Sequence, residues 1–319
     1  MIYLDWNVFN QLEKISELPD DVALVYKKML QIIQENKIST PYSNAHISDL
    51  YRGYVKNPIY TPAHLRHITD MTKNLCIVQY WGEPKIRIHY RQPSEFLEST
   101  AEEFENTAAT FSSLFNSIDD PLMQGVFGMQ RTMMRFQSID ESFRTIYSVN
   151  PIFSIIFPRT KVEMNQLALC EDLYDFARKI KTDYALYKNY RKFLTECQQK
   201  FPSYKNLYQV MHNKIIGTPK SIAWDDIWDL ATPDFKPSSN VFYDKIIHLF
   251  TTTDLKGYNQ DERFANLLDD ALHCFYAAHC ECFVTLDLRC ANKAKLVYNK
   301  LKIPAKVVTP LEYISMMGM

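Results

Sequence analysis

The sequence is poor in glycine. Only 7 of its 319 residues are glycine, about 2% where about 7% is usual. These glycines are scattered, and only Gly125 and Gly128 lie close together. No segment can therefore form a Walker loop or a G-x-G-x-x-G dinucleotide fingerprint. This excludes proteins that bind phosphate through a glycine-rich loop.

The sequence also lacks net charge and long apolar runs. It has 36 Lys and Arg against 37 Asp and Glu, so a polyanion must be bound by a local patch or through a metal ion. Apolar runs such as residues 151–158 are far shorter than a bilayer span, and no basic segment followed by an apolar stretch begins the chain. We expect a cytoplasmic protein with no membrane partner.

Hydropathy patterns predict an α/β fold whose strands lie near both ends of the chain. Short apolar segments predict strands at residues 1–4, 37–42, 76–80, 85–90, 282–285 and 305–308. Helical spacing follows Asp20, Ser43 and Thr61, with Ser43 as a candidate N-cap, and returns at residues 261–280 and 291–302. Alternation of this kind favours a central, mostly parallel sheet covered by helices.

Residues 93–250 have a different character. Helical periods dominate there, in segments 94–115, 162–180, 184–200 and 241–250. The pattern predicts a large all-α insertion at 93–250 that divides one α/β domain into an N-terminal part, 1–92, and a C-terminal part, 251–319. With 46% hydrophobic residues, the chain can bury a sizeable core.

Single acidic residues fall at or just beyond predicted strand ends. Asp5 follows the first strand, Asp49 lies on the helix after the second, and Asp287 follows the late strand, while Asp270, with Asp269 beside it, lies on a late helix. The C-terminal ends of parallel strands form one crevice, where distant acids can meet. Carboxylates with open positions suit Mg²⁺ or Mn²⁺, and a pair of such ions can activate water and stabilise the leaving oxygen of a phosphodiester.

Four short segments carry a family resemblance. They are Leu4-Asp5-Trp6-Asn7, residues 42–50 around His46 and Asp49, Asp270-Ala271-Leu272-His273 continuing to Ala278, and Phe283-Val284-Thr285-Leu286-Asp287. In order and strand context they resemble the PIN-like domain family, a metal-dependent ribonuclease fold of three layers around a mostly parallel sheet.

The resemblance assigns roles residue by residue. It implies that Asp5, Asp49, Asp270 and Asp287 are catalytic and bind Mg²⁺ or Mn²⁺, while Asn7 and Thr285 orient ligands or water. Asp269 is an extra acidic neighbour of this set. Leu286 stands where a further Asp often occurs in the family, which removes an outer ligand.

Two histidines allow two interpretations each. His273 follows Asp269 and Asp270 by one helical turn, so it can contact either carboxylate. It is either a residue that orients a ligand or contacts phosphate, or a hydrogen-bonded structural histidine. His46, three residues before Asp49, leaves the same choice open.

A zinc site is the rival interpretation of the C-terminal region. Its candidate ligands are His273, Cys274, His279, Cys280, Cys282 and Cys290. Structural zinc sites usually have cysteine pairs spaced by two to four residues, and Cys280-Glu281-Cys282 is too tight for that pattern. Buried free thiols explain these cysteines more simply, and an odd total of seven fits reduced thiols.

Residues 288–311 contain no acid but six basic side chains. Arg289, Lys293 and Lys295 lie closest to Asp287 and are candidates to bind a nucleic-acid backbone with salt-sensitive affinity. The simpler interpretation is a solvated helix face.

The sequence thus leads to two hypotheses. The first is a divalent-metal-dependent endonuclease that hydrolyses RNA in preference to DNA, of the kind used as a toxin or antiphage effector. The second is a non-catalytic PIN-like scaffold that binds RNA or a protein partner. In either case the helical insertion is a candidate surface for a protein partner or regulator.

Overall fold

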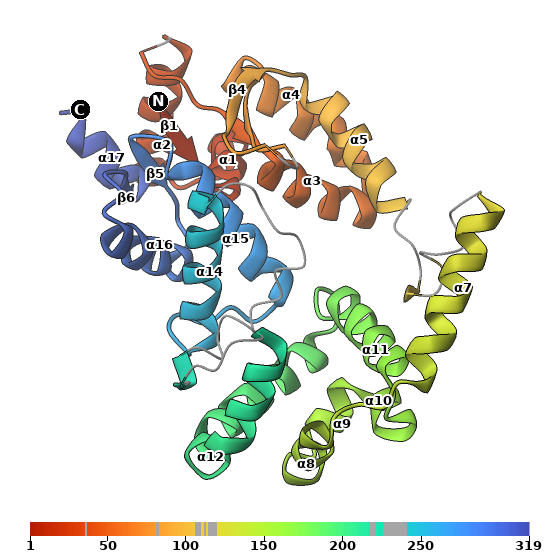
Figure 1. Ribbon diagram of the computed structural model, residues 1–319. Coiled ribbons are helices and arrows are strands. Elements are labelled where there is room, and N and C mark those ends of the chain that lie inside the picture. Colours follow the sequence, from red (N-terminus) through yellow and green to blue (C-terminus); the bar gives the residue numbers. More distant parts are fainter. Residues whose placement is uncertain are drawn as a thin grey trace. The chain divides into compact units, whose positions relative to one another are not determined.

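The computed structural model describes residues 1–35, 37–80, 83–105, 110, 111, 113, 120–216, 221, 223–225 and 241–318. The chain divides into two compact units (Figure 1). The first is Met1–Asn106 with Phe235–Asp261 and Asn266–Met319, and the second is Thr107–Asp234 with Glu262–Ala265. Both ends of the chain therefore build the first unit.

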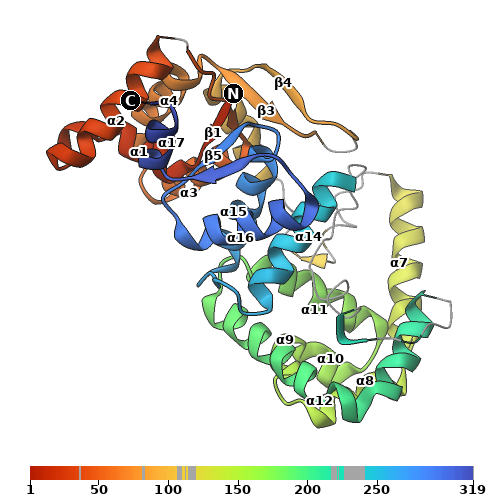
Figure 2. The same cartoon turned by 90° about the vertical axis from the view of Figure 1, so that its left-hand side faces the viewer.

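The strands of the first unit form two three-stranded sheets. One has the order β1 (Ile2–Leu4), β5 (Cys282–Val284), β6 (Lys306–Val308), all parallel. The other has the order β2 (Tyr42–Ser43), β3 (Leu75–Val78), β4 (Arg87–Tyr90), with β2 and β3 parallel. Strands β3 and β4, which lie side by side in Figure 2, are antiparallel.

The predicted single sheet is thus present in two parts. One backbone hydrogen bond, from Ile2 N to Ser39 O at 3.0 Å, links β1 to the segment that leads into β2. The predicted strand at 37–42 was wrong except for its last residue. Pro41 has no N–H group to donate to a neighbouring strand, which limits pairing in this segment. The strands predicted at the chain ends are confirmed.

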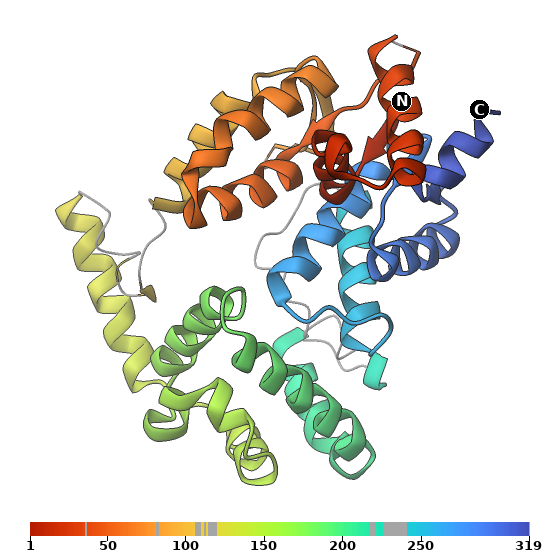
Figure 3. The same ribbon diagram turned by 180° about the vertical axis from the view of Figure 1, so that it is seen from behind.

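Helices surround these sheets. In chain order they are α1 (Trp6–Glu13), the 3₁₀ helix η1 (Ile15–Glu17), α2 (Asp20–Gln34), α3 (Asn44–Lys56), the 3₁₀ helix η2 (Pro58–Tyr60), α4 (Thr61–Thr72), α5 (Pro93–Glu105), α14 (Val241–Leu255), α15 (Phe264–Ala277), α16 (Leu288–Leu301) and α17 (Pro310–Met316). Helix α17 packs on α2, so elements near the two ends of the chain lie side by side (Figure 3). Among the described residues, no helix has both the length and the apolar character to cross a bilayer.

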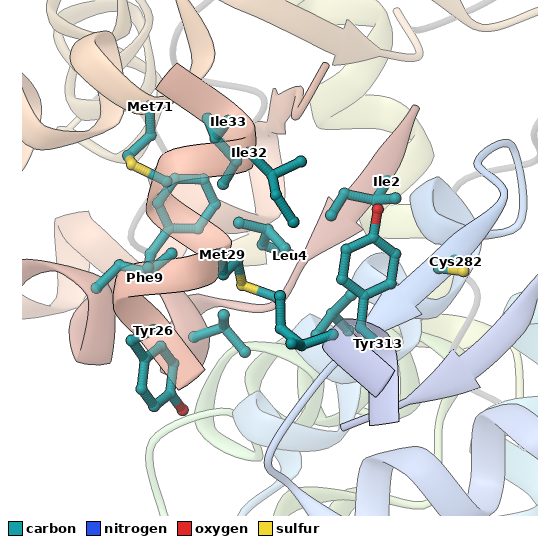
Figure 4. Packing of buried hydrophobic residues seen from close by; sticks show 14 residues of the cluster. Ile2, Leu4, Phe9, Tyr26, Met29, Ile32, Ile33, Met71, Cys282 and Tyr313 are labelled. Atoms are coloured by element: carbon teal, nitrogen blue, oxygen red, sulfur yellow. The ribbon is translucent and has the colours of Figure 1, made fainter. Parts of the chain in front are cut away.

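The main core of the first unit joins residues from both ends of the sequence. Ile2 and Leu4 of β1 pack with Phe9 of α1, Met29 of α2 and Tyr313 of α17 (Figure 4). Each of these side chains is buried, and burying one contributes about 1.5–3 kcal/mol. Because β1 is part of this core, its packing fixes the backbone position of Asp5, the next residue.

All the regular secondary structure described in the second unit is helical. These are α7 (Pro121–Phe136), α8 (Glu141–Val149), α9 (Phe153–Ile156), α10 (Pro158–Glu163), α11 (Gln166–Lys179) and α12 (Tyr184–Ile216). The helix expected at 162–180 is broken, because Met164 has a positive φ of 49° and the Asn165 side chain caps α11 by accepting a hydrogen bond from Ala168 N. Asn is a favoured N-cap residue.

The unit boundaries differ from the expected insertion at 93–250. Helix α5 belongs to the first unit because it packs on α3 and α4, and α14 belongs there because it packs on α16. Part of the helix expected at 94–115 lies outside the described residues.

Candidate functional site

Asp5 lies at the end of β1, buried beneath the N-terminus of α1. It occupies the N-cap position of that helix, but its side chain makes no capping hydrogen bond. Instead its Oδ2 accepts hydrogen bonds from Asn7 Nδ2 at 2.7 Å and from Thr285 Oγ1 at 2.5 Å. The two residues expected to orient ligands or water therefore do contact this acid.

Burial raises the pKa of Asp5 above its ordinary value, the neighbouring His273 and the Thr285 hydrogen bond lower it in part, and Asp49 raises it further. The side chain is 5% exposed. A buried carboxylate of this kind is costly to ionise unless a positive charge lies nearby.

Asp270 lies on α15 among other acids. Burial raises the pKa of its carboxyl group well above the ordinary range, and Asp261, Asp5 and Asp287 raise it further while Lys293 lowers it in part. Within the described ranges, no hydrogen bond is found to the Asp270 carboxylate. Negative charge therefore gathers here without full compensation.

Asp287 performs a structural task as well. Its Oδ1 accepts hydrogen bonds from Arg289 N at 2.7 Å and Cys290 N at 3.0 Å, which caps α16. Thr285 Oγ1 accepts a hydrogen bond from Asp287 N at 3.0 Å and so connects this turn to Asp5. Leu286 N donates to Asn7 Oδ1, while the Leu286 side chain is exposed.

Asp49 has a different environment from the one expected. Arg52 Nη2 is paired with its Oδ1, and Arg52 Nη1 lies 2.6 Å from Asp269 Oδ2. His273 Nε2 lies 2.9 Å from Asp49 Oδ2. Both oxygens of Asp49 therefore already contact cationic or hydrogen-bonding groups. Asp269 forms an ion pair with the same arginine.

His273 connects these acids to the interior. Its Nδ1 is 2.8 Å from the Tyr3 hydroxyl, and its Nε2 is 3.9 Å from Asp5 Oδ1. Burial alone would lower the pKa of His273, but the Asp49 hydrogen bond and the Asp5 charge raise it above its ordinary value. The structure therefore supports an orienting role for His273 toward Asp49 and Asp5.

His46 is a structural histidine. Its Nδ1 accepts a hydrogen bond from Ser43 N at 3.0 Å, and its Nε2 is 2.8 Å from Leu4 O. Because a backbone N–H can only donate and a carbonyl oxygen can only accept, Nδ1 is unprotonated and Nε2 carries the hydrogen. Burial is the main reason that the pKa of His46 is lowered to about 3.

Ser43 explains why α3 begins where it does. Its Oγ accepts a hydrogen bond from Ala45 N, and the His46 side chain accepts one from Ser43 N. Together these bonds make a capping box. The same hydroxyl lies 2.6 Å from the Tyr3 hydroxyl. The start of α3 is therefore fastened to β1, and Asp49 follows one turn later.

Lys293 was wrongly expected to contact a nucleic acid. Its side chain is fully buried, with Nζ 2.8 Å from Asp254 Oδ2 and also paired with Asp261. Nζ lies 4.8 Å from the centre of the Phe250 ring. The ammonium group is needed to compensate these buried carboxylates. Arg289 and Lys295 are exposed on the same helix, and their contact with nucleic acid stays a prediction.

Carboxylate side chains are the type of ligand that a divalent cation prefers, but the described side chains do not form a complete set of ligands around one point. In the described part of the chain, no group of three or more His, Cys, Asp or Glu is arranged to hold a metal ion. The charges of Asp261, Asp5 and Asp287 nevertheless act together on Asp270, and a hard cation would neutralise this negative charge.

Zinc is less well matched. All seven cysteines lie in the described residues, none of them forms a disulfide, and all but Cys170 are buried. Burial raises the pKa of Cys274 and Cys290, which disfavours the thiolate that zinc binds. His279 Nε2 is buried and has no hydrogen-bond partner in the described ranges, and its ring packs on Phe242 and Phe275.

Three residues, Arg52, Tyr3 and Ser43, were not assigned to this site from the sequence. Arg52 could have been found, because Asp49 and Arg52 have the i, i+3 spacing of helical ion pairs. Tyr3 lies within an apolar run and looked like any core aromatic, and Ser43 was expected only as a helix cap.

Comparison of the chain with protein-family models, with curated proteins and with solved structures finds no match.

Proposed function

We propose that this protein is a divalent-metal-dependent endonuclease with a PIN-like domain, hydrolysing phosphodiester bonds of RNA in preference to DNA. The observation that carries the proposal is the gathering of Asp5, Asp270 and Asp287, which come from a strand end, a helix and a helix N-cap far apart in the sequence. The negative charges that act on Asp270 are of the kind that a bound divalent cation would neutralise.

Asp5, Asp270 and Asp287 would hold Mg²⁺ or Mn²⁺, and Asn7 and Thr285 fix the orientation of Asp5 through their hydrogen bonds. His273 holds Asp49 beside this group. When bound, such an ion supplies Lewis-acid activation of water and neutralises charge on the phosphodiester.

The test compares two adjacent acids. Asp270→Asn should abolish Mn²⁺ binding in a calorimetric titration and lower the cleavage of labelled RNA by at least about 100-fold. Asp269→Asn is the matched control, because Asp269 is paired with Arg52, and it should keep Mn²⁺ binding and most of the activity.

A further arm uses Asp5→Asn and EDTA. Both should remove cleavage of RNA and DNA oligonucleotides, while the circular dichroism spectrum stays unchanged. Full activity of Asp5→Asn, or activity undiminished in EDTA, would overturn the proposal.

A second candidate function is a scaffold that binds RNA or a protein without cutting. It is favoured by Asp49, whose two carboxylate oxygens contact Arg52 and His273. It predicts that no metal-dependent cleavage occurs with varied RNAs and DNAs, while binding persists in the presence of EDTA.

A further inference from the structure

A pocket opens in the first unit beside Asp49. Its volume is about 340 Å³, within the range of about 300–1,000 Å³ that is usual for ligand sites. Helix α1 lines it with Trp6, Asn10 and Gln11, and α3 lines it with Asp49 and Tyr54. The segment from η2 into α4 completes the wall. Apart from Asp49, none of these residues has so far been given a role in binding.

The walls of the pocket are fixed to each other. His64 Nδ1, on α4, lies 2.6 Å from Glu13 Oε2 on α1, and the His64 ring meets Trp6 edge to face, 5.9 Å between centres. His67 Nε2 lies 3.0 Å from Phe9 O. The pocket is therefore built by the fold, and binding does not require it to form first.

The aromatic side chains of the pocket are unusually exposed. Tyr60 is 61% and Tyr54 41% exposed, although both are large aromatic residues. Tyr54 is held in place by stacking on Tyr51, with ring centres 6.1 Å apart. Exposed aromatic rings of this kind are platforms on which bases stack.

The polar side chains of the pocket suit a base edge. Asn10 and Gln11 each offer an amide with donors and an acceptor, and within the described part of the chain these amides make no hydrogen bond. Lys14, also in the lining, is exposed and supplies one positive charge. Amide groups pair with base edges and lysine with phosphate, whereas a purely apolar pocket would favour a hydrophobic side chain.

The position of the pocket connects it to the acids. Asp49 lines it, and Trp6 directly follows Asp5. We propose that this pocket binds an unpaired base of a single-stranded RNA, so that the neighbouring phosphate is placed beside the acidic group. The inference rests on the proposed nuclease function for the identity of the strand, but its test measures binding alone.

Gly53 offers a direct way to fill the pocket. It lies in the lining on α3, and a Cβ added there would meet no atom within 4 Å. The Cβ of Gly53→Leu therefore meets no clash, and the substitution improves the helix propensity of α3. Gly125→Leu on α7 is the matched control, since Gly125 is also helical and equally open.

The experiment measures anisotropy of a fluorescent single-stranded RNA hexamer in EDTA. Gly53→Leu and Tyr60→Ala should weaken binding by about 5- to 150-fold, the loss expected for one stacked base. Gly125→Leu should bind as the unaltered protein does, and so should Tyr90→Ala, which removes a tyrosine that is 77% exposed on β4 outside the pocket. A hexamer series with one abasic position should lose affinity only when the abasic position removes the base in the pocket.

The outcomes separate this inference from the proposed function. Unchanged affinity of Gly53→Leu, equal affinity for every abasic hexamer, or no binding by the unaltered protein would each overturn the base pocket, even if cleavage is observed. Pocket-dependent binding without any metal-dependent cleavage would overturn the nuclease and retain the pocket. Capture of a peptide in place of RNA, lost in Gly53→Leu, would also overturn the assignment to a base.

Discussion

His273 and Asp49 lie 224 residues apart in the chain, and their side chains meet at 2.9 Å. The contact joins α15, from the C-terminal part of the first unit, to α3, from its N-terminal part. His273 also contacts Tyr3 on β1. A single imidazole therefore holds three elements together around the acids, and this leads to the first of five predictions.

Replacing His273 should destabilise the fold strongly. His273→Leu leaves one oxygen of Asp49 without its buried partner and takes from the Tyr3 hydroxyl one of its partners, with Ser43 remaining. The expected loss is about 3–5 kcal/mol in the free energy of unfolding by urea. His279→Leu is the matched control, because its ring packs on Phe242 and Phe275. The control should lose less than about 1.5 kcal/mol. Equal effects of the two substitutions would contradict the bridging role of His273.

Lys293 should be essential for stability rather than for binding RNA. Lys293→Met leaves Asp254 and Asp261 buried without their cation, at a cost of about 3–5 kcal/mol. Lys300→Met, an exposed position on the same helix, should change stability by no more than about 0.5 kcal/mol. A stable Lys293→Met protein with weakened RNA binding would restore the discarded interpretation.

The same variant has a pH signature. Burial raises the pKa of Asp261 to about 6, although Lys293 lowers it in part. A carboxyl group whose folded pKa lies above its unfolded value stabilises the protein most below the unfolded value, and this contribution is lost as pH rises through the folded pKa. Without the ammonium group the folded pKa rises further. Lys293→Met should therefore regain stability relative to the unaltered protein when urea unfolding is repeated at pH 5 instead of pH 8.

His46 should make the fold sensitive to acid. Its folded pKa is lowered to about 3, so the unfolded chain binds the proton first, and stability is lost as pH falls below about 6.5, by up to about 1.4 kcal/mol per pH unit. His46→Gln keeps a capping-box residue at this position but cannot titrate. Urea unfolding from pH 7 to pH 5 should show a smaller loss in this variant. Parallel curves for the two proteins would refute the assignment.

Arg289 should contribute to RNA binding through charge. It is exposed and follows Asp287 by two residues. If it contacts one phosphate of a single strand, Arg289→Ala should reduce the slope of log affinity against log salt by about 0.7. Lys300→Ala, near the other end of α16, should leave that slope unchanged. An unaltered slope for Arg289→Ala would remove this helix N-terminus from the binding surface.

Local pattern was sufficient for the elements that carry the candidate site. The apolar run before Asp5 predicted β1, and Ser43 predicted the start of α3 through its capping chemistry. The run around Phe283 likewise predicted β5. These predictions depend on a few consecutive residues, so the local sequence pattern was enough to make them.

Long-range partners were beyond the sequence. Lys293 looked exposed within a basic segment, yet it lies on the buried face of α16 with Cys290, Ala294 and Val297. That helical spacing was visible in the sequence, but nothing local indicated that Asp254 and Asp261 would meet the ammonium group. The engagement of Asp49 by Arg52 and His273 depended likewise on how α3 and α15 pack.

The pairing of β1 with β5 also implies a delay during synthesis, because the two strands are made at different times. Ile2 is in register with Cys282, so β1 leaves the ribosome long before its parallel neighbour β5 has been made. At about 5–20 residues per second this interval is about 15–60 s. During it the apolar edge of β1 is open, and the growing chain has to be shielded, by its own helices or by chaperones, until the last strands emerge.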